Sequence, residues 1–195
     1  MGDSSPIKVV FCGDSSTGKT SVLLNYINGS APKSTKPTIA AAFFTREVKI
    51  HERLFDLVLW DTAGQETYRG LAPMYYRGSA LAFLLFDVTS RKTFENLGDW
   101  IQSIRSEAGD KTIISIVGNK IDIEDLREID TFQAQDYATN EHCLYFETSA
   151  ITGHGIDRMM QISLEELATS FIPEDKPTPV PIAITENPQK NGGCC

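Results

Sequence analysis

A glycine-punctuated run near the N-terminus has the residue types of a phosphate-binding loop. Residues 13–20 read Gly-Asp-Ser-Ser-Thr-Gly-Lys-Thr, which fits the pattern G-x-x-x-x-G-K-[ST]. The run follows a strand-like apolar stretch over residues 7–12 and precedes a segment with helical spacing. In that context backbone N–H groups and a helix N-terminus point at one anion. We expect Lys19 beside the outer phosphates and the Thr20 hydroxyl on Mg²⁺. An ordinary strand-to-helix turn is the alternative.

A second run, residues 60–66, follows an apolar stretch and reads Trp-Asp-Thr-Ala-Gly-Gln-Glu. Asp61 could hold Mg²⁺ through a bound water, and the N–H of Gly64 could meet a γ-phosphate. Gln65 would then lie beside the phosphate that is attacked. Since a glutamine is no strong base, its expected task is to orient the attacking water. A strand followed by an aspartate and a glycine turn is common, so this string alone is a weak signal. Because it follows a phosphate loop by about forty residues, it predicts phosphoryl transfer.

Two later strings could recognise a base. Residues 119–122 read Asn-Lys-Ile-Asp, and residues 147–150 read Glu-Thr-Ser-Ala. A carboxylate can accept two hydrogen bonds from the N1–H and 2-amino groups of guanine, whereas adenine has an acceptor at N1, so Asp122 predicts a guanine site. The stem of Lys120 could cover one face of the base, and Asn119 could tie the segment to the phosphate loop. The second string would offer a backbone N–H to the guanine O6. Each string, taken alone, is equally consistent with a plain turn.

The elements that must position these strings alternate between strand-like and helix-like patterns. Such alternation predicts a P-loop α/β fold, with a six-stranded, mostly parallel sheet, helices on both faces and the ligand at the carboxyl ends of the strands. The second and third strands are joined by a short polar turn and should pair antiparallel. The expected strands are 7–12, 43–50, 55–60, 81–88, 113–117 and 143–146, and the expected helices are 18–28, 93–108, 130–139 and 155–171.

Length and composition favour one domain in a chain of 195 residues, of which 41% are hydrophobic. We expect an N-terminal extension over residues 1–6, a nucleotide-binding domain over 7–172 and a disordered tether over the proline-rich residues 173–195. The net charge of −8 argues against nucleic acid as a partner. No apolar stretch approaches the ~20 residues of a membrane span, and no signal-peptide core is present, so we expect a cytosolic protein.

The strings described above, together with Thr38 in Pro-Thr-Ile, resemble the Ras-superfamily small GTPases over residues 7–172. Further strings are similar to the Rab family, and two of them are most like its early-endosomal branch. The Rab-like strings are Tyr-Tyr-Arg-Gly at 75–78, Leu-Phe-Asp-Val-Thr at 85–89 and the terminal Cys194-Cys195; the early-endosomal ones are Ile-Ala-Ala-Ala-Phe at 39–43 and Leu-Ala-Pro-Met-Tyr-Tyr at 71–76.

The resemblance implies a role for each matching residue. Gln65 would be catalytic, and Thr20, Thr38 and Asp61 would serve Mg²⁺, with Thr38 meeting the metal only when a γ-phosphate is present. Phe43, Trp60 and Tyr75 would form an aromatic patch read by effectors; core packing is the alternative for these three. The residues implied to bind GTP or GDP are Ser15, Ser16, Thr17, Gly18, Lys19, Thr20, Ser21, Thr38, Gly64, Asn119, Lys120, Asp122, Ser149, Ala150 and Ile151.

The implied function is a membrane-anchored switch that hydrolyses GTP and regulates vesicle trafficking of the endocytic kind. Its implied partners are effectors, an exchange factor, a GTPase-activating protein, a GDP-dissociation inhibitor and the prenylation machinery that would lipidate Cys194 and Cys195. It would divide between the cytosol and the cytoplasmic face of intracellular membranes, endosomal ones in particular. Two alternatives remain: a nucleotide-loaded scaffold that never hydrolyses, which Gln65 argues against, and an ATP-using P-loop enzyme, which Asp122 disfavours.

The sequence departs from the family pattern in three places. Ala31 stands where most relatives carry an aromatic residue that covers one face of the guanine, and Ile151 replaces a lysine near the base. Residues 15–17 are bulkier than the glycine-rich loops of many relatives. A missing ring could remove about 1–3 kcal/mol of stacking, unless Tyr26 or another ring covers the base. We therefore expect nucleotide release to be faster than in relatives that have the ring.

The guanine assignment predicts the outcome of one substitution. Asp122→Asn should weaken GTP binding at least about tenfold, because one acceptor is lost. The variant should favour xanthosine nucleotides, whose base has a carbonyl where guanine has an amine. Competition binding with both nucleotides measures the preference, with Asp125→Asn as a neighbouring control. An unchanged preference for GTP in the Asp122 variant would refute the assignment.

Overall fold

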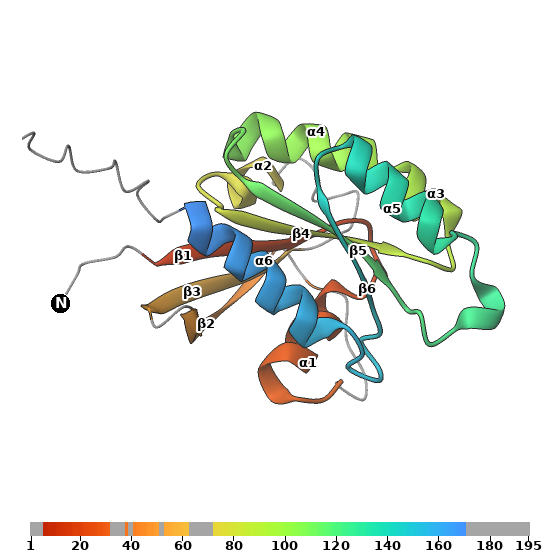
Figure 1. Cartoon of the computed structure of the whole chain (residues 1–195), viewed down its shortest axis with the longest axis horizontal. Coiled ribbons are helices and arrows are strands. Elements are labelled where there is room, and N and C mark those ends of the chain that lie inside the picture. Colours follow the sequence, from red (N-terminus) through yellow and green to blue (C-terminus); the bar gives the residue numbers. More distant parts are fainter. Residues whose placement is uncertain (1–5, 32–37, 39–40, 51–52, 63–71, 171–195) are drawn as a thin grey trace, which may run out of the picture.

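The computed structural model describes residues 6–31, 38, 41–50, 53–62 and 72–170, and these form a three-layer α/β domain (Figure 1). Its centre is a six-stranded sheet with the order β2-β3-β1-β4-β5-β6. β2 pairs antiparallel with β3, and every other neighbouring pair is parallel. The strands are β1 (Ile7–Cys12), β2 (Ala41–Ile50), β3 (Arg53–Thr62), β4 (Leu81–Asp87), β5 (Ile113–Asn119) and β6 (Leu144–Thr148).

Helices cover both faces of the sheet (Figure 1). α1 and α6 pack against one face, and α2, α3, α4 and α5 pack against the other, so that two hydrophobic cores flank the strands. The helices are α1 (Lys19–Asn28), α2 (Ala72–Tyr76), α3 (Arg91–Glu95), α4 (Leu97–Ala108), α5 (Thr131–Asn140) and α6 (Ile156–Ser170), with a 3₁₀ turn, η2 (Glu124–Leu126).

The central strand β4 shows why helices must cover both faces of the sheet. All seven of its residues are buried. Phe83 and Leu85 pack with α1 and α6, whereas Leu84 and Phe86 pack on the opposite side. A continuous apolar run is the pattern of a parallel strand covered on both faces. The predicted fold class, including the antiparallel second strand, is therefore confirmed.

Some elements differ from the sequence prediction. The helix expected over 93–108 is two helices, because Asn96 at their junction has ψ −6°, far from the helical value of about −42°. α2 and η2 were not predicted, since five and three residues are too few to display a helical period. β3 extends beyond its apolar run because its pairing with β2 continues through Arg53, Asp61 and Thr62, and β2 begins two residues earlier at Ala41, which pairs with Thr62.

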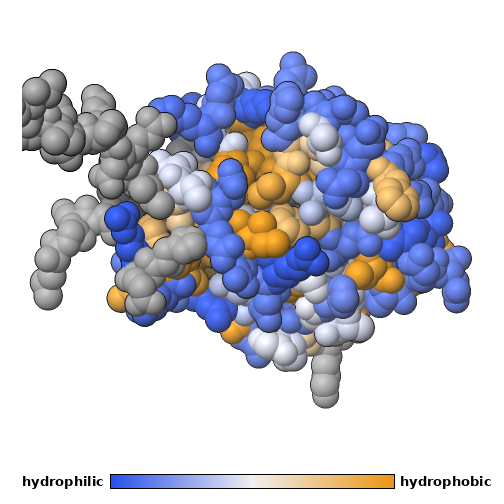
Figure 2. Space-filling model, viewed as in Figure 1, coloured by the Kyte–Doolittle hydropathy of each residue, from blue (hydrophilic) through white to orange (hydrophobic). Residues whose placement is uncertain are grey.

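The surface on the face shown in Figure 2 is mostly hydrophilic, with apolar side chains gathered in the band between α4 and α6. Within the described part of the chain, none of the helices combines the length and apolar character needed to cross a bilayer. The N-terminal extension and the tether expected over residues 173–195 fall outside the described residues, apart from Pro6.

Candidate functional site

The strings singled out from the sequence converge at the carboxyl ends of the parallel strands. The phosphate-loop residues follow β1, Asp61 lies at the end of β3, Asn119 ends β5 and Thr148 ends β6. Parallel strands share one edge at which all of them end, and ligands of α/β sheets bind there. The fold thus brings together segments that lie more than a hundred residues apart in the sequence.

The phosphate-loop backbone needs glycine at two positions. Gly13 has φ 124° and Gly18 has φ 94°. A Cβ at Gly13 would overlap the carbonyl oxygen of Leu85, and one at Gly18 would overlap the side-chain amide of Asn119. Ser16 also has a positive φ, 65°, which few residues other than glycine adopt. Of the bulkier residues noted in the sequence, Ser15 and Ser16 are exposed, whereas Thr17 is buried and its hydroxyl donates to the carbonyl oxygen of Asp14 (3.0 Å).

Lys19 is a buried cation held under this loop. Only 5% of the residue is exposed, and its Nζ donates to the carbonyl oxygens of Gly13 (3.0 Å) and Asp14 (2.6 Å). Burial lowers the pKa of Lys19 to about 8, and the nearby carboxylate of Asp61 opposes that shift. A phosphate beside this ammonium would favour its charged form in the same way. The residue is therefore suited to bind an anion at this edge of the sheet.

Thr20, Thr38 and Asp61 form a compact cluster of oxygen atoms next to Lys19. Asp61 Oδ2 accepts hydrogen bonds from the hydroxyls of Thr20 (2.7 Å) and Thr38 (3.1 Å), and the two hydroxyls lie 2.9 Å apart. The three residues expected to serve a metal thus share one place.

Asp61 also shows that this cluster suits a cation. The residue is 1% exposed, and its Oδ1 has no hydrogen-bond partner among the described residues. Burial raises the pKa of Asp61, against the hydrogen bonds from Thr20 and Thr38. One carboxylate with hydroxyl oxygens and room for water and phosphate is the set that Mg²⁺ commonly takes in nucleotide sites. The residues present therefore fit Mg²⁺.

Asn119 links three loops of the site. Its side chain is 1% exposed, and Nδ2 donates to the carbonyl oxygen of Thr17 in the phosphate loop (2.8 Å). Oδ1 accepts from the Thr148 hydroxyl and from the backbone N–H of Ala150, both at 3.1 Å. This is the link to the phosphate loop that the sequence analysis expected.

The residues expected near the base lie in the loops that follow β5 and β6. Lys120 has a positive φ, 73°, and its Nζ lies 2.5 Å from Asp87 Oδ2, so its stem is held in place. Asp122 is exposed, and Ser149 and Ala150 are buried in the loop after β6. Ile151 is 68% exposed.

Tyr26, the ring that could stand in for the aromatic missing at Ala31, packs against Arg46. The Tyr26 ring lies under the guanidinium of Arg46, 4.2 Å from it, and Arg46 donates to the Tyr26 carbonyl oxygen (2.6 Å). The ring thus belongs to the packing between α1 and β2. The compensation by Tyr26 that the sequence analysis left open finds no support in this arrangement.

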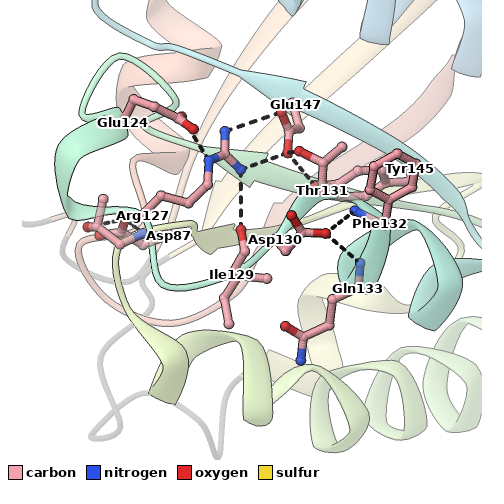
Figure 3. Close-up of polar contacts among 11 residues, drawn as sticks. Asp87, Glu124, Arg127, Ile129, Asp130, Thr131, Phe132, Gln133, Tyr145 and Glu147 are labelled. Atoms are coloured by element: carbon pink, nitrogen blue, oxygen red, sulfur yellow. Dashed lines mark hydrogen bonds and ion pairs between the residues drawn. The ribbon is translucent and has the colours of Figure 1, made fainter.

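Sequence reasoning missed an ion-pair network behind the base-site loops (Figure 3). The Arg127 side chain is 15% exposed, and its Nη1 and Nη2 reach the two carboxylate oxygens of Glu147 at 2.9 and 3.4 Å. Glu147 also accepts from the hydroxyls of Thr131 and Tyr145, both at 2.9 Å. The network joins the segment after η2 to the first residue of the Glu-Thr-Ser-Ala string. Only the unusual burial of an arginine could have revealed it, and a sequence does not show burial.

The three expected effector residues lie side by side on β2, β3 and α2. The Trp60 ring is 5.7 Å from that of Phe43 and 6.0 Å from that of Tyr75. Phe43 is 63% exposed, whereas Trp60 and Tyr75 are half-buried and also pack on the core beneath. The surface and core interpretations therefore both hold in part. Gly64, Gln65, Cys194 and Cys195 lie outside the described residues.

Comparison with known proteins decides the family: residues 8–169 match the model described as "Ras family". The chain belongs to the Ras family. It is 39% identical to Rab-22A of Mus musculus over 153 residues, covering 78% of this chain and 79% of the relative. It is 36% identical to Rab-31 of Rattus norvegicus over 155 residues (80% of each chain) and 32% identical to Rab5A of Oryza sativa over 192 residues (96% and 94%).

These relatives identify the chain as a Rab-type small GTPase that binds guanine nucleotide and hydrolyses GTP. The sequence prediction of a Rab-family GTPase, most like the early-endosomal branch, is confirmed. In this GTPase the oxygen cluster around Asp61 and the Asn119 link lie on the edge of the sheet where the family motifs meet.

The Arg127 network generates a prediction about this GTPase. Arg127→Ala should leave the Glu147 carboxylate without its charged partner, at a cost of about 1–3 kcal/mol, and loosen the loop after β6. Release of a fluorescent GDP analogue should then be roughly tenfold faster, the rate equivalent of about 1.4 kcal/mol. Arg158→Ala, an exposed arginine on α6, is the control and should release GDP at the wild-type rate. Equal rates in all three proteins would contradict the role given to the network.

Proposed function

We propose that the protein is a membrane-anchored switch that alternates between a GTP-bound, effector-binding state and a GDP-bound state in vesicle trafficking, on endosomal membranes in particular. The observation that carries the proposal is the contact of Thr38 with Thr20 and Asp61. It places a residue from the loop before β2 directly at the phosphate loop. A segment that can attach there, and be released when a phosphate leaves, is the bistable element that a nucleotide switch requires.

In the proposed GTP-bound state Lys19 holds the outer phosphates and Asp122 selects the guanine. Thr20 and Thr38 supply hydroxyl oxygens to Mg²⁺, and Asp61 holds the metal through a bound water. When bound, Mg²⁺ neutralises charge that develops on the phosphate oxygens. Ser15 to Ser21 line the phosphates, and the backbone from Ser149 to Ile151 lies beside the base.

Hydrolysis in this proposal depends on Gln65, which orients the attacking water near the N–H of Gly64. The phosphate loop, residues 13–20, contains no arginine. A positive charge supplied in trans by an activating protein accelerates such reactions by about 10³–10⁵-fold. The proposed intrinsic reaction is therefore slow, which lets the GTP-bound state persist until an activating protein meets it.

The aromatic patch is the proposed surface for effectors. Phe43, Trp60 and Tyr75 come from elements on either side of the segment 63–71, which carries Gln65, so their arrangement can respond to the bound nucleotide. An exchange factor, an activating protein and a GDP-dissociation inhibitor are the further kinds of partner. The names Rab-22A, Rab-31 and Rab5A among the relatives support an endosomal setting for these interactions.

Attachment to the membrane is assigned to lipids on Cys194 and Cys195, added by the prenylation machinery. One lipid chain holds a protein only marginally, whereas two hold it well. Residues 173–195 contain two lysines against three acidic residues, so charge adds no attraction to anionic lipid. We propose that these residues act as a disordered tether behind the domain of residues 7–172.

Substitution of the glutamine tests the switch. Gln65→Leu should retain GTP binding and lose most single-turnover hydrolysis, because the side chain orients water and does not hold the nucleotide. Thr20→Asn should instead disturb the Mg²⁺ ligands and favour a GDP-bound or empty protein. Single-turnover assays with radiolabelled GTP measure the first effect, with the exposed α4 variant Gln102→Ala as control. Hydrolysis at equal rates by wild type and Gln65→Leu would leave only a nucleotide-loaded scaffold.

Replacement of both terminal cysteines tests the anchor. The variant with Cys194→Ser and Cys195→Ser should shift from the membrane fraction to the cytosol, and each single variant should bind membranes partially and reversibly. GTP hydrolysis should be unchanged, because the tether separates the anchor from the nucleotide site. Fractionation of cells that express each protein gives the measurement. Persistent membrane association of the double variant would assign the anchoring to another surface or a protein partner.

A further inference from the structure

The phosphate loop contains a carboxylate that the proposed function does not use. Asp14 follows Gly13 directly, in a loop that binds anions. Its Oδ2 accepts a hydrogen bond from the side-chain amide of Asn96 (2.6 Å), and its Oδ1 accepts one from the indole N–H of Trp100 (2.9 Å). Both donors come from the α3–α4 region, 82 and 86 residues further along the chain.

The backbone of the same residue holds the phosphate-binding lysine. The Asp14 carbonyl oxygen accepts from Lys19 Nζ (2.6 Å) and from the Thr17 hydroxyl (3.0 Å). Asp14 is therefore bound through its side chain to α4 and through its backbone to Lys19. Movement of the Asp14 peptide must also move the oxygen on which the lysine rests.

The donors on α4 are well anchored. Trp100 is 4% exposed and packs in the core between α4 and the sheet, together with Leu97 and Ile101 on the same helix. Asn96 is half-buried at the junction between α3 and α4, where its backbone N–H bonds back to α3. Because packed cores are rigid, these donors define a fixed position for the Asp14 carboxylate.

The chemistry of the contact favours a carboxylate. Asn96 and Trp100 both donate an N–H, and each oxygen of Asp14 accepts one of them. An asparagine at that place could accept from Trp100 and donate to a turned Asn96 amide, but both hydrogen bonds would lose the negative charge that strengthens them. A carboxylate that lost these donors could also turn toward the phosphates, where like charges repel.

We propose that Asp14 is a positioning residue for Lys19, and that Asn96 and Trp100 set the nucleotide affinity of this GTPase by holding Asp14 in place. The inference rests on the role of Lys19 in the proposed function. It also connects the nucleotide to α4, so that a partner that shifts α4 as a whole would accelerate nucleotide release. We name this contact the Asp14 clamp, formed by Asp14, Asn96 and Trp100.

Exchange of the acceptor at residue 14 with the donor at residue 96 tests the clamp. Asn96→Asp would place two carboxylates together, and Asp14→Ala would remove both acceptors, so each should accelerate GDP release roughly tenfold, by loss of one charge-assisted hydrogen bond. The combined variant Asp14→Asn with Asn96→Asp restores a donor and an acceptor, since Asn at 14 can donate to Asp at 96 and accept from Trp100. Its release rate should return to within about threefold of wild type.

A second measurement separates positioning from a merely structural role. The ³¹P chemical shift of the β-phosphate of bound GDP reports the charge that Lys19 brings to it. That shift should change in the two single variants and in Trp100→Phe, which keeps an aromatic ring and removes the N–H, and should return in the combined variant. Gln102→Ala on the exposed side of α4 is the matched control.

The outcomes are distinct. Wild-type release rates in both single variants, or a combined variant no better than the single ones, would overturn the clamp. Unchanged phosphate shifts despite faster release would also overturn it, because Lys19 would then be undisturbed. A failure of the proposed switch would appear elsewhere, as hydrolysis by Gln65→Leu at the wild-type rate, while GDP release from the clamp variants remains measurable.

Discussion

The site depends on one buried amide, the side chain of Asn119. With its nitrogen on Thr17 and its oxygen shared by Thr148 and Ala150, it joins the loops that follow β1, β5 and β6. A buried amide that loses a partner costs the full desolvation of that group, so the three loops favour one relative arrangement. Gly18 is a consequence, because any side chain there would overlap the same amide. The phosphate site and the base site are in this way parts of one structure.

A second constraint is the burial of charge. Lys19 and Asp61 are both almost inaccessible to water. Burial favours the neutral form of each side chain, and the neighbouring charges and hydrogen bonds oppose that effect only in part. Buried charges are costly unless they are paired or bind an ion. Asp61 Oδ1, which has no hydrogen-bond partner among the described residues, and the lysine under the phosphate loop therefore fit a cation and a phosphate. Arg127 and Glu147 meet the same constraint within the protein, and that pair supports the base-site loops.

Several side-chain hydrogen bonds connect the loops of the candidate site to other elements of the domain. Asp14 reaches α4, Asn25 on α1 donates to the carbonyl oxygen of Ala150, and Thr38 reaches Asp61. Each contact joins a residue of the nucleotide site to an element with a surface of its own. Trp60 of the aromatic patch is the residue before Asp61, and Trp100 on α4 donates to Asp14, so both elements connect directly to residues of the candidate site.

The sequence by itself determined the fold class, the antiparallel pairing of the second and third strands and the places of the chemical motifs, because apolar periodicity and glycine spacing are local properties. It could not determine the break at Asn96, the short elements α2 and η2, the pairing of Arg127 with Glu147 or the Asp14 clamp. The short elements are too brief to display a helical period. The ion pair and the clamp depend on side chains that meet across 20 to 86 residues of chain. Burial and partner choice arise only when the helices pack on the sheet, and for that reason tertiary structure alone decided how the charged residues of the site are held.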